Sequence, residues 1–202
     1  MSPLLFLFPQ AQLLTAAIRE HLIDSPPASP VLFASADLGR PLWVQSFARI
    51  FHTDMAFVNK QRTPDGTFVK YIIGEVKDHH VIIYDDMTRT GGTLINAAEA
   101  YLSKGAAKVS AVLSHLALAS EEVIKKLEVR ERWRCSMQRS VRLTSIQRRE
   151  LCDALQDSPI SKVIATNSHP MSQNPLVKAS DKFIILDCAV LFADAIRCLD
   201  RE

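Results

Sequence analysis

The chain has 202 residues, of which 48% are hydrophobic and 23% are charged. This length and composition suit one globular domain and exclude a disordered tail, a collagen-like rod and a small disulfide-stapled protein. The formal net charge of +2 is too small to indicate a nucleic-acid partner. No apolar run approaches the roughly 18 residues that a membrane span needs, so we expect no membrane partner.

The apolar run Leu4–Phe8 opens the chain. No basic residue precedes it and Pro9 ends it, so it does not fit a secretory signal. We expect it to pack against another subunit or a missing domain, which predicts a homo- or hetero-oligomer. The four cysteines contain no C-x-x-C pair, which indicates neither a zinc site nor a redox motif. Four scattered thiols fit a reducing compartment, so we expect a cytoplasmic location.

Helical and strand-like segments alternate along the rest of the chain. Apolar spacing predicts helices at residues 10–22, 42–51, 92–104 and 190–199, and short β-branched runs predict strands at 31–34, 55–58, 68–73, 81–84, 109–113, 162–165 and 183–186. Residues 61–66 are polar and rich in turn formers, and are predicted to be a loop. This alternation favours an α/β fold with a mostly parallel sheet flanked by helices, in one domain spanning residues 1–202.

A basic helical tract at about residues 120–150 interrupts the alternation. From Lys125 to Arg149 the chain carries nine Lys or Arg residues against Glu128 and Glu131. One interpretation is a solvated helical insertion, because charge runs are usually exposed. The other is a contact surface for an anion, a nucleic acid or another subunit, which Trp133 favours because indoles are enriched at interfaces.

The segment Val81–Leu94 indicates a function. A buried strand ends in Asp85 and Asp86, at the carboxyl edge where open α/β sheets bind their ligands. The following loop, residues 88–93, is rich in Thr and Gly and leads into a helix; small residues let backbone N–H groups close around a phosphate, and the helix N-terminus favours an anion. Paired carboxylates accept hydrogen bonds from vicinal hydroxyls. The segment therefore predicts a sugar-phosphate site, the alternative being an ordinary acidic strand-to-helix turn.

Residues 85–94 resemble the ribose-phosphate loop of type I phosphoribosyltransferases and, more closely, that of the ribose-phosphate diphosphokinase (phosphoribosyl pyrophosphate, PRPP, synthetase) family. Segments 35–39, 59–62, 74–77, 105–111, 164–168 and 186–196 resemble the same family in the same order. The resemblance thus spans roughly residues 31–197, apart from the basic insertion. It implies a type I phosphoribosyltransferase-like fold and the Mg²⁺-dependent transfer of diphosphate from ATP to ribose 5-phosphate, which makes PRPP for nucleotide biosynthesis.

The resemblance also implies roles for individual residues. Asp85 and Asp86 correspond to the carboxylates that hold the ribose hydroxyls, and Asp37 to an aspartate near metal and diphosphate. Lys60 and Arg62 correspond to the catalytic cations of a mobile loop that closes over the transferring phosphates. The residues of the phosphate loop are Thr88, Arg89, Thr90, Gly91, Gly92 and Thr93. The simpler interpretations are a solvated loop for the two cations and a turn or cap for Asp37.

Three histidines near these segments receive structural interpretations. His115 stands where the family has a Thr-His-Gly run, and we interpret it as a core or strand-end histidine. His79 and His80 are adjacent on an extended segment, so their side chains are expected to point to opposite faces and to form no metal site.

Two departures from the family pattern keep the function open. Arg89 stands where family members commonly carry Asp, and the amino-terminal half that supplies adenine contacts has no counterpart in these residues. One function is a diphosphokinase or a subunit of one, which takes ATP only with a partner domain. A second is a non-catalytic regulatory paralogue that binds ribose 5-phosphate or PRPP, and a third is a phosphoribosyltransferase that uses PRPP and a base.

Overall fold

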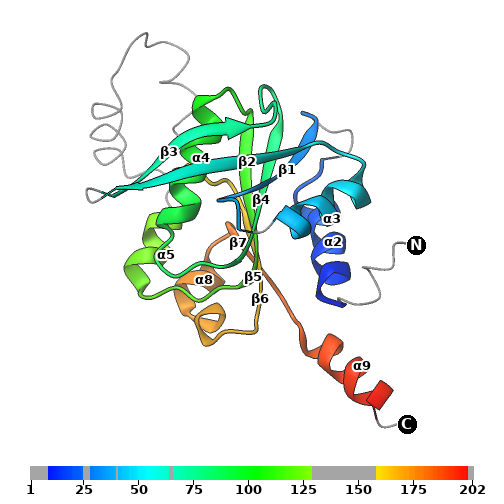
Figure 1. Cartoon of the computed structure of the whole chain (residues 1–202). Helices are drawn as coiled ribbons and strands as arrows, with labels where there is room; N and C mark the ends of the chain where they lie inside the picture. Colours follow the sequence, from blue (N-terminus) through cyan, green and yellow to red (C-terminus); the bar gives the residue numbers. More distant parts are fainter. Residues whose placement is uncertain (1–8, 25–27, 40, 64–65, 129–157, 200–202) are drawn as a thin grey trace.

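A single seven-stranded sheet organises the chain. The computed structural model describes residues 9–24, 28–39, 41–63, 66–128 and 158–199. The strands are β1 (Val31–Ser35), β2 (Met55–Thr63), β3 (Gly66–Ile73), β4 (His80–Met87), β5 (Lys108–His115), β6 (Val163–Thr166) and β7 (Phe183–Leu186), in the spatial order β3-β2-β1-β4-β5-β6-β7 (Figure 1). Neighbouring strands are parallel except for the antiparallel pair β2–β3. The predicted α/β fold with a mostly parallel sheet is confirmed.

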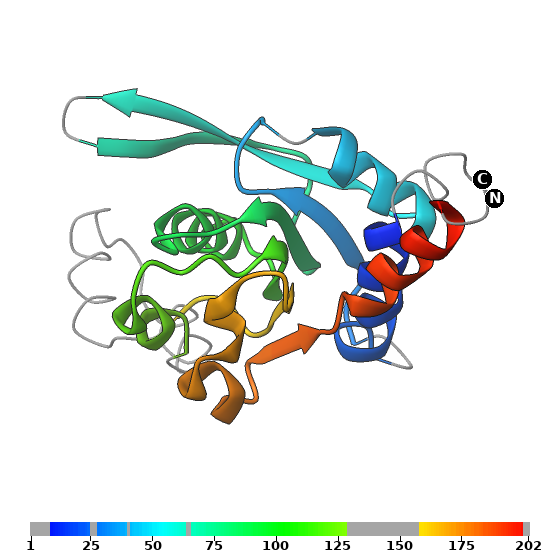
Figure 2. The same cartoon turned by 90° about the horizontal axis from the view of Figure 1, so that it is seen from below.

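Helices cover both faces of the sheet (Figure 2). Helices α2 (Pro9–His21) and α3 (Pro41–Phe51) pack on one face, and α4 (Gly92–Ser103), α5 (Glu121–Glu128) and α8 (Pro175–Ala179) pack on the other. A short 3-10 helix, η1 (Pro170–Gln173), precedes α8. Strand β4 shows how one segment serves both cores: Val81 and Ile83 pack with α4, whereas Ile82 and Tyr84 pack with α3. Because both faces are buried, the strands are continuous apolar runs.

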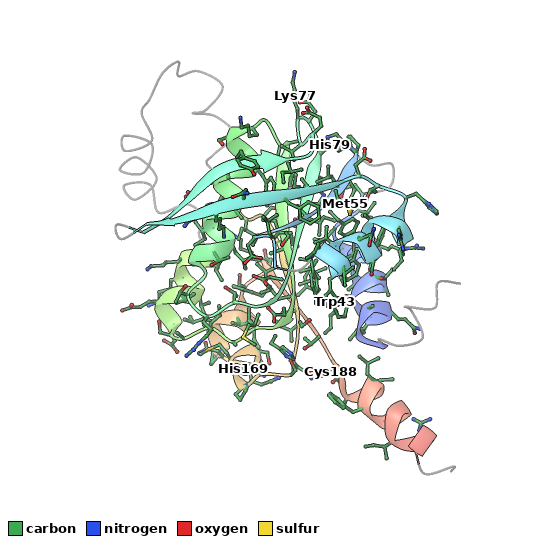
Figure 3. The ribbon with its side chains drawn as sticks, viewed as in Figure 1. Trp43, Met55, Lys77, His79, His169 and Cys188 are labelled. Carbon is green, nitrogen blue, oxygen red and sulfur yellow. The ribbon has the colours of Figure 1, made fainter. Side chains whose placement is uncertain are left out.

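The parallel strands bring all their carboxyl ends to one edge of the sheet. Lys77 and His79, just before β4, lie at the edge where the parallel strands begin (Figure 3). His169 and Cys188, which follow β6 and β7, lie toward the opposite edge. Residues that follow β1, β4 and β5 therefore meet although they are far apart in the sequence.

The prediction of a loop over residues 61–66 is wrong for 61–63 and 66, which lie in strands, while 64–65 lie outside the described residues. Strand β2 continues to Thr63 and β3 begins at Gly66, and the register pairs these two residues. The hairpin extends beyond the rest of the sheet (Figure 2). Apolar alternation marks strands that are packed on one face, and a projecting hairpin does not need it. A polar strand of this kind is easily mistaken for a loop.

Helix α9 (Ala189–Leu199) projects away from the sheet (Figure 1). Its residues Val190, Phe192 and Ile196 are 62%, 63% and 65% exposed. Of the predicted basic insertion, helix α5 is described, and the remainder lies in residues 129–157, outside the described residues, as does the segment Leu4–Phe8. Among the helices that the structure describes, none combines the length and apolar character that crossing a membrane requires.

Candidate functional site

Two acidic side chains form the end of β4. Asp85 and Asp86 are both half-buried. Asp85 Oδ1 accepts a hydrogen bond from the Asp86 backbone N–H at 2.9 Å, and Asp86 Oδ1 accepts one from the Met87 N–H at 2.9 Å. Burial, together with the neighbouring charges of Asp86 and Asp37, raises the pKa of Asp85 to about 6. The environment at the end of β4 thus disfavours the ionised form of Asp85. Perturbed pKa values of this kind are common at binding sites.

Asp37 lies beside this pair because β1 lies beside β4. Ser35 is in register with Tyr84, so the residues after both strands continue side by side. Asp37 Oδ1 accepts a hydrogen bond from the Gly39 N–H at 2.7 Å, and the Asp37 N–H donates to Ser35 Oγ at 3.2 Å. These local bonds give Asp37 the turn-forming role that the simpler interpretation expects, while its charge still acts on Asp85.

The loop between β4 and α4 presents backbone N–H groups. Within the described part of the chain, no oxygen accepts a hydrogen bond from the backbone N–H groups of residues 88–93. Thr88 is buried, and Gly91 precedes α4 with a φ of 72°, which favours glycine. The loop is anchored through its carbonyl oxygens: the Ala119 N–H donates to Arg89 O at 2.8 Å, and the Ile95 N–H donates to Gly91 O at 2.9 Å. The donors and the N-terminus of α4 are thus available to an anion.

The two predicted catalytic cations lie on the hairpin. Lys60 is on β2, and its Nζ lies 3.5 Å from the carbonyl oxygen of Thr93, in the first turn of α4. The structure therefore brings Lys60 to the phosphate loop. Arg62 lies further along β2, where its backbone pairs with Thr67, and its side chain is outside the described part of the structure.

A buried tyrosine links the two halves of the site. The Tyr101 hydroxyl, on α4, donates to the carbonyl oxygen of Ser35 at 2.7 Å. Burial raises the pKa of this hydroxyl. The bond ties the helix behind the phosphate loop to the strand end that carries Asp37. Tyr101 lies in the helix predicted over residues 92–104, and its hydroxyl is the only sequence signal for this bond, because a buried tyrosine usually finds an acceptor.

The three histidines lie close to where the sequence interpretation put them. His115 ends β5, and its Nδ1 lies 2.6 Å from Ser168 Oγ, so it is a strand-end histidine at the carboxyl edge. His80 is buried, with Nε2 2.9 Å from Ser110 Oγ, whereas His79 contacts the carbonyl oxygen of Lys77 through Nδ1 at 2.7 Å. The two adjacent histidines do not converge on one site.

The carboxyl edge thus combines hydrogen-bond acceptors, from the aspartates, with hydrogen-bond donors, from the loop backbone. Asp85 and Asp86 can accept hydrogen bonds from neighbouring hydroxyls, and the loop beside them can bind a phosphate. Within the described residues, no three Asp, Glu, His or Cys side chains form a group able to hold a metal ion by themselves. The three nearby aspartates still fit Mg²⁺, because this ion is usually held by one or two carboxylates together with substrate phosphates and water.

Comparisons with known proteins identify the family of this chain. A family model described as a phosphoribosyl transferase domain matches residues 14–145. A ribose-phosphate pyrophosphokinase of Clostridium acetobutylicum is 30% identical over 168 residues, which cover 83% of this chain and 43% of that protein. A ribose-phosphate pyrophosphokinase of Maricaulis maris is 37% identical over 111 residues, covering 54% and 34%. The chain spans about half the length, or less, of these curated relatives.

A solved structure shows the same fold. The phosphoribosylpyrophosphate synthetase of Mycobacterium smegmatis superposes with a TM-score of 0.64 at 23% identity. The match covers 95% of this chain and 50% of that one. Almost all of this chain therefore corresponds to a part of the larger protein.

Proposed function

Since the chain belongs to the phosphoribosyl transferase domain family, we propose that the carboxyl edge of its sheet binds ribose 5-phosphate or PRPP. The observation that supports this proposal is the pairing of Asp85 and Asp86 with a loop whose backbone N–H groups find no acceptor among the residues that the structure describes. The carboxylates would accept the hydrogen bonds of the ribose 2- and 3-hydroxyls. The loop residues 88–93 would bind the 5-phosphate, with the N-terminus of α4 behind them.

The proposed reaction is the transfer of diphosphate from ATP to ribose 5-phosphate. The oxygen of the 1-hydroxyl bonds to the β-phosphorus of ATP, the bond from that phosphorus to the α,β-bridging oxygen breaks, AMP leaves, and the hydroxyl proton passes to solvent. Lys60, whose ammonium lies by the phosphate loop, and Arg62 would offset the charge of the transferring group. ATP binding is proposed to take place with a partner domain, which would supply the part of the curated relatives that this chain does not match.

Mg²⁺ is the proposed cofactor. Asp37 would hold it near Asp85 and Asp86, and the ion would neutralise phosphate charge during the transfer. The raised pKa of Asp85 supports this role, since a cation beside the cluster would favour the ionised carboxylate. In this proposal Asp37 contacts the ion, whereas Asp85 and Asp86 contact the sugar.

The exposed Arg89 favours a second function, a regulatory chain that binds its ligand without turning it over. Arg89 stands where the family commonly has Asp, and a guanidinium beside a phosphate loop can pair with the 5-phosphate in a bidentate manner. Such a pair would strengthen binding and shift the reacting 1-hydroxyl, where a displacement of about 1 Å can cost about a hundredfold in rate.

Calorimetry and a coupled assay test these functions. Ribose 5-phosphate titrated with Mg²⁺ should release heat with the natural chain, and the double variant Asp85→Asn, Asp86→Asn should bind at least tenfold more weakly, because hydrogen bonds to charged groups are strong. No heat, or equal affinity, contradicts the proposed site. Release of AMP from ATP and ribose 5-phosphate identifies the diphosphokinase; binding without AMP release, with a candidate partner half present, identifies the regulatory chain.

The remaining proposals concern the whole molecule. We infer a single phosphoribosyltransferase-like domain over residues 1–202, with an insertion at about 120–150, that acts in the cytoplasm as a homo- or hetero-oligomer. Four cysteines scattered along the sequence support a reducing compartment, and the exposed apolar residues of α9 support a partner subunit. Light scattering at about 22 kDa, unchanged by a candidate partner, would contradict the oligomer.

A further inference from the structure

A cavity lies at the other edge of the sheet, where the parallel strands begin. Its volume is about 450 Å³, within the range of about 300–1,000 Å³ that is typical of small-molecule sites. Its lining comes from segments that precede or begin β1, β4, β5, β6 and β7, among them Val31, His80, Lys108, Lys162 and Lys182. The candidate ribose-phosphate site follows the carboxyl ends of the same strands, so the two sites are separated by the length of the sheet.

Three lysines of neighbouring strands gather at this cavity. Lys108 begins β5, and Lys162 and Lys182 immediately precede β6 and β7. Val163 is in register with Phe183, so Lys162 and Lys182 are adjacent across the two strands. Lys182 is only 6% exposed. The lining therefore brings three lysine side chains from neighbouring strands to one cavity.

The other charged side chains of the lining lie nearer to solvent. Asp24 and Asp181 are exposed, so water screens their charges more than those of the lysines. The Lys162 ammonium donates to the carbonyl oxygen of Asp181 at 3.1 Å, which holds it beside Lys182. Among the described lining residues, three lysines thus stand against two aspartates.

Polar and apolar groups complete the lining. His80 and Ser158 are buried, and the His80 ring contacts the Ser110–Ser161 hydroxyl pair through Ser110. Burial and the charge of Lys108 lower the pKa of His80 to about 4, so the ring is neutral and adds no charge to the cavity. Apolar walls are supplied by Leu22, Ile23, Leu102, Val109, Pro159 and Ile160. The cavity lining therefore combines cationic side chains with apolar ones.

We propose that this cavity binds a phosphate monoester of about mononucleotide size, with the phosphate between Lys108, Lys162 and Lys182 and the organic group against the apolar wall. Lysine ammonium groups bind phosphate as point charges, and the volume exceeds what phosphate alone needs. This site is independent of the proposed ribose-phosphate site, because none of its lining residues belongs to the carboxyl edge.

The test is a titration of the full chain with adenosine 5′-monophosphate, followed by amide NMR. The expected result is a set of shifts at residues 22–24, 107–109 and 158–162, outside the loop 88–93. The double variant Lys108→Gln, Lys162→Gln removes two cations without touching the more buried Lys182, and should bind at least tenfold more weakly, as expected for lost charge-assisted hydrogen bonds. The matched control Lys178→Gln, on the exposed side of α8, should change the affinity less than about twofold.

Three results of the titrations with adenosine 5′-monophosphate would overturn the proposal. The first is the absence of shifts at the cavity, and the second is shifts confined to the loop 88–93, which would mean that the nucleotide occupies the carboxyl edge alone. The third is an unchanged affinity in the double variant whose spectrum shows that it is folded. Repeating the titration with inorganic phosphate and with adenosine separates the two halves of the ligand: each should bind more weakly than the monophosphate, and equal binding by adenosine would also contradict a phosphate site.

Discussion

Replacing Asp85 with Asn should stabilise the folded chain while weakening its ligand binding. The carboxylate is half-buried near Asp86 and Asp37, which raises its pKa from 3.8 to about 6. The folded chain therefore holds the Asp85 proton more tightly than the unfolded chain does. By linkage, the free energy of unfolding falls as the pH rises from about 4 to 6, and the loss persists at higher pH. Asn keeps the size and the hydrogen-bond acceptor and carries no charge.

The size of this effect follows from the two pKa values. Each pH unit between them corresponds to about 1.4 kcal/mol, which sets a ceiling of about 3 kcal/mol. Because the side chain is partly open to water, screening reduces the expected gain to about 1–1.5 kcal/mol at pH 8. At pH 4 the gain should nearly vanish, because Asp85 is then protonated in the folded chain.

Urea unfolding of both chains at pH 4 and pH 8 measures the difference. Asp187 provides the control of opposite sign: hydrogen bonds from the Ala189 N–H and the Asn167 side chain lower its pKa. Asp187→Asn should therefore destabilise the chain at pH 8, and this loss should disappear as the pH falls below about 4. An Asp85→Asn chain that is equally or less stable than the natural one at pH 8 would refute the electrostatic reasoning.

Further predictions concern the phosphate loop and its support. Gly91→Ala should cost about 1–2 kcal/mol of unfolding free energy in urea, because φ is 72° there; Gly92→Ala, without positive φ, should change it by less than about 0.5 kcal/mol. Tyr101→Phe should cost about 1–2 kcal/mol by leaving the Ser35 carbonyl oxygen without its buried donor, and a chain of unchanged stability would contradict this. Arg89→Asp should weaken calorimetric binding of ribose 5-phosphate at least tenfold, and equal affinity would indicate that Arg89 points to solvent.

The segment around β4 was the most predictable part of the molecule. Each part of this segment predicts its own structure. The apolar residues predict a buried strand, the Thr- and Gly-rich residues predict a turn, and the residues after the turn predict a helix. The rule that ligands bind at carboxyl strand edges then located the candidate site. Asp37 could be associated with it only through the family resemblance, because its proximity depends on β1 lying next to β4.

Features that depend on tertiary contacts were less accessible from the sequence. The hairpin of β2 and β3 extends where the local residues favour a turn, since pairing between strands outweighs local preference. The bond from Tyr101 to Ser35 joins residues 66 positions apart. The cavity at the opposite edge is lined by lysines at the start of three strands. In the sequence, each of these lysines is an ordinary polar residue at a strand boundary.

The position of β1 in the sheet affects the order in which the chain can fold. Both of its neighbours come later in the sequence, and Val31 pairs with His80, which follows 49 positions later. The hairpin of β2 and β3 can form from local contacts, whereas β1 must wait until β4 is available, so closing this long connection is expected to be slow. During synthesis on the ribosome, Phe33 and its neighbours therefore stay incompletely paired until residue 87 has emerged, and this interval is when the apolar strand is most open to aggregation.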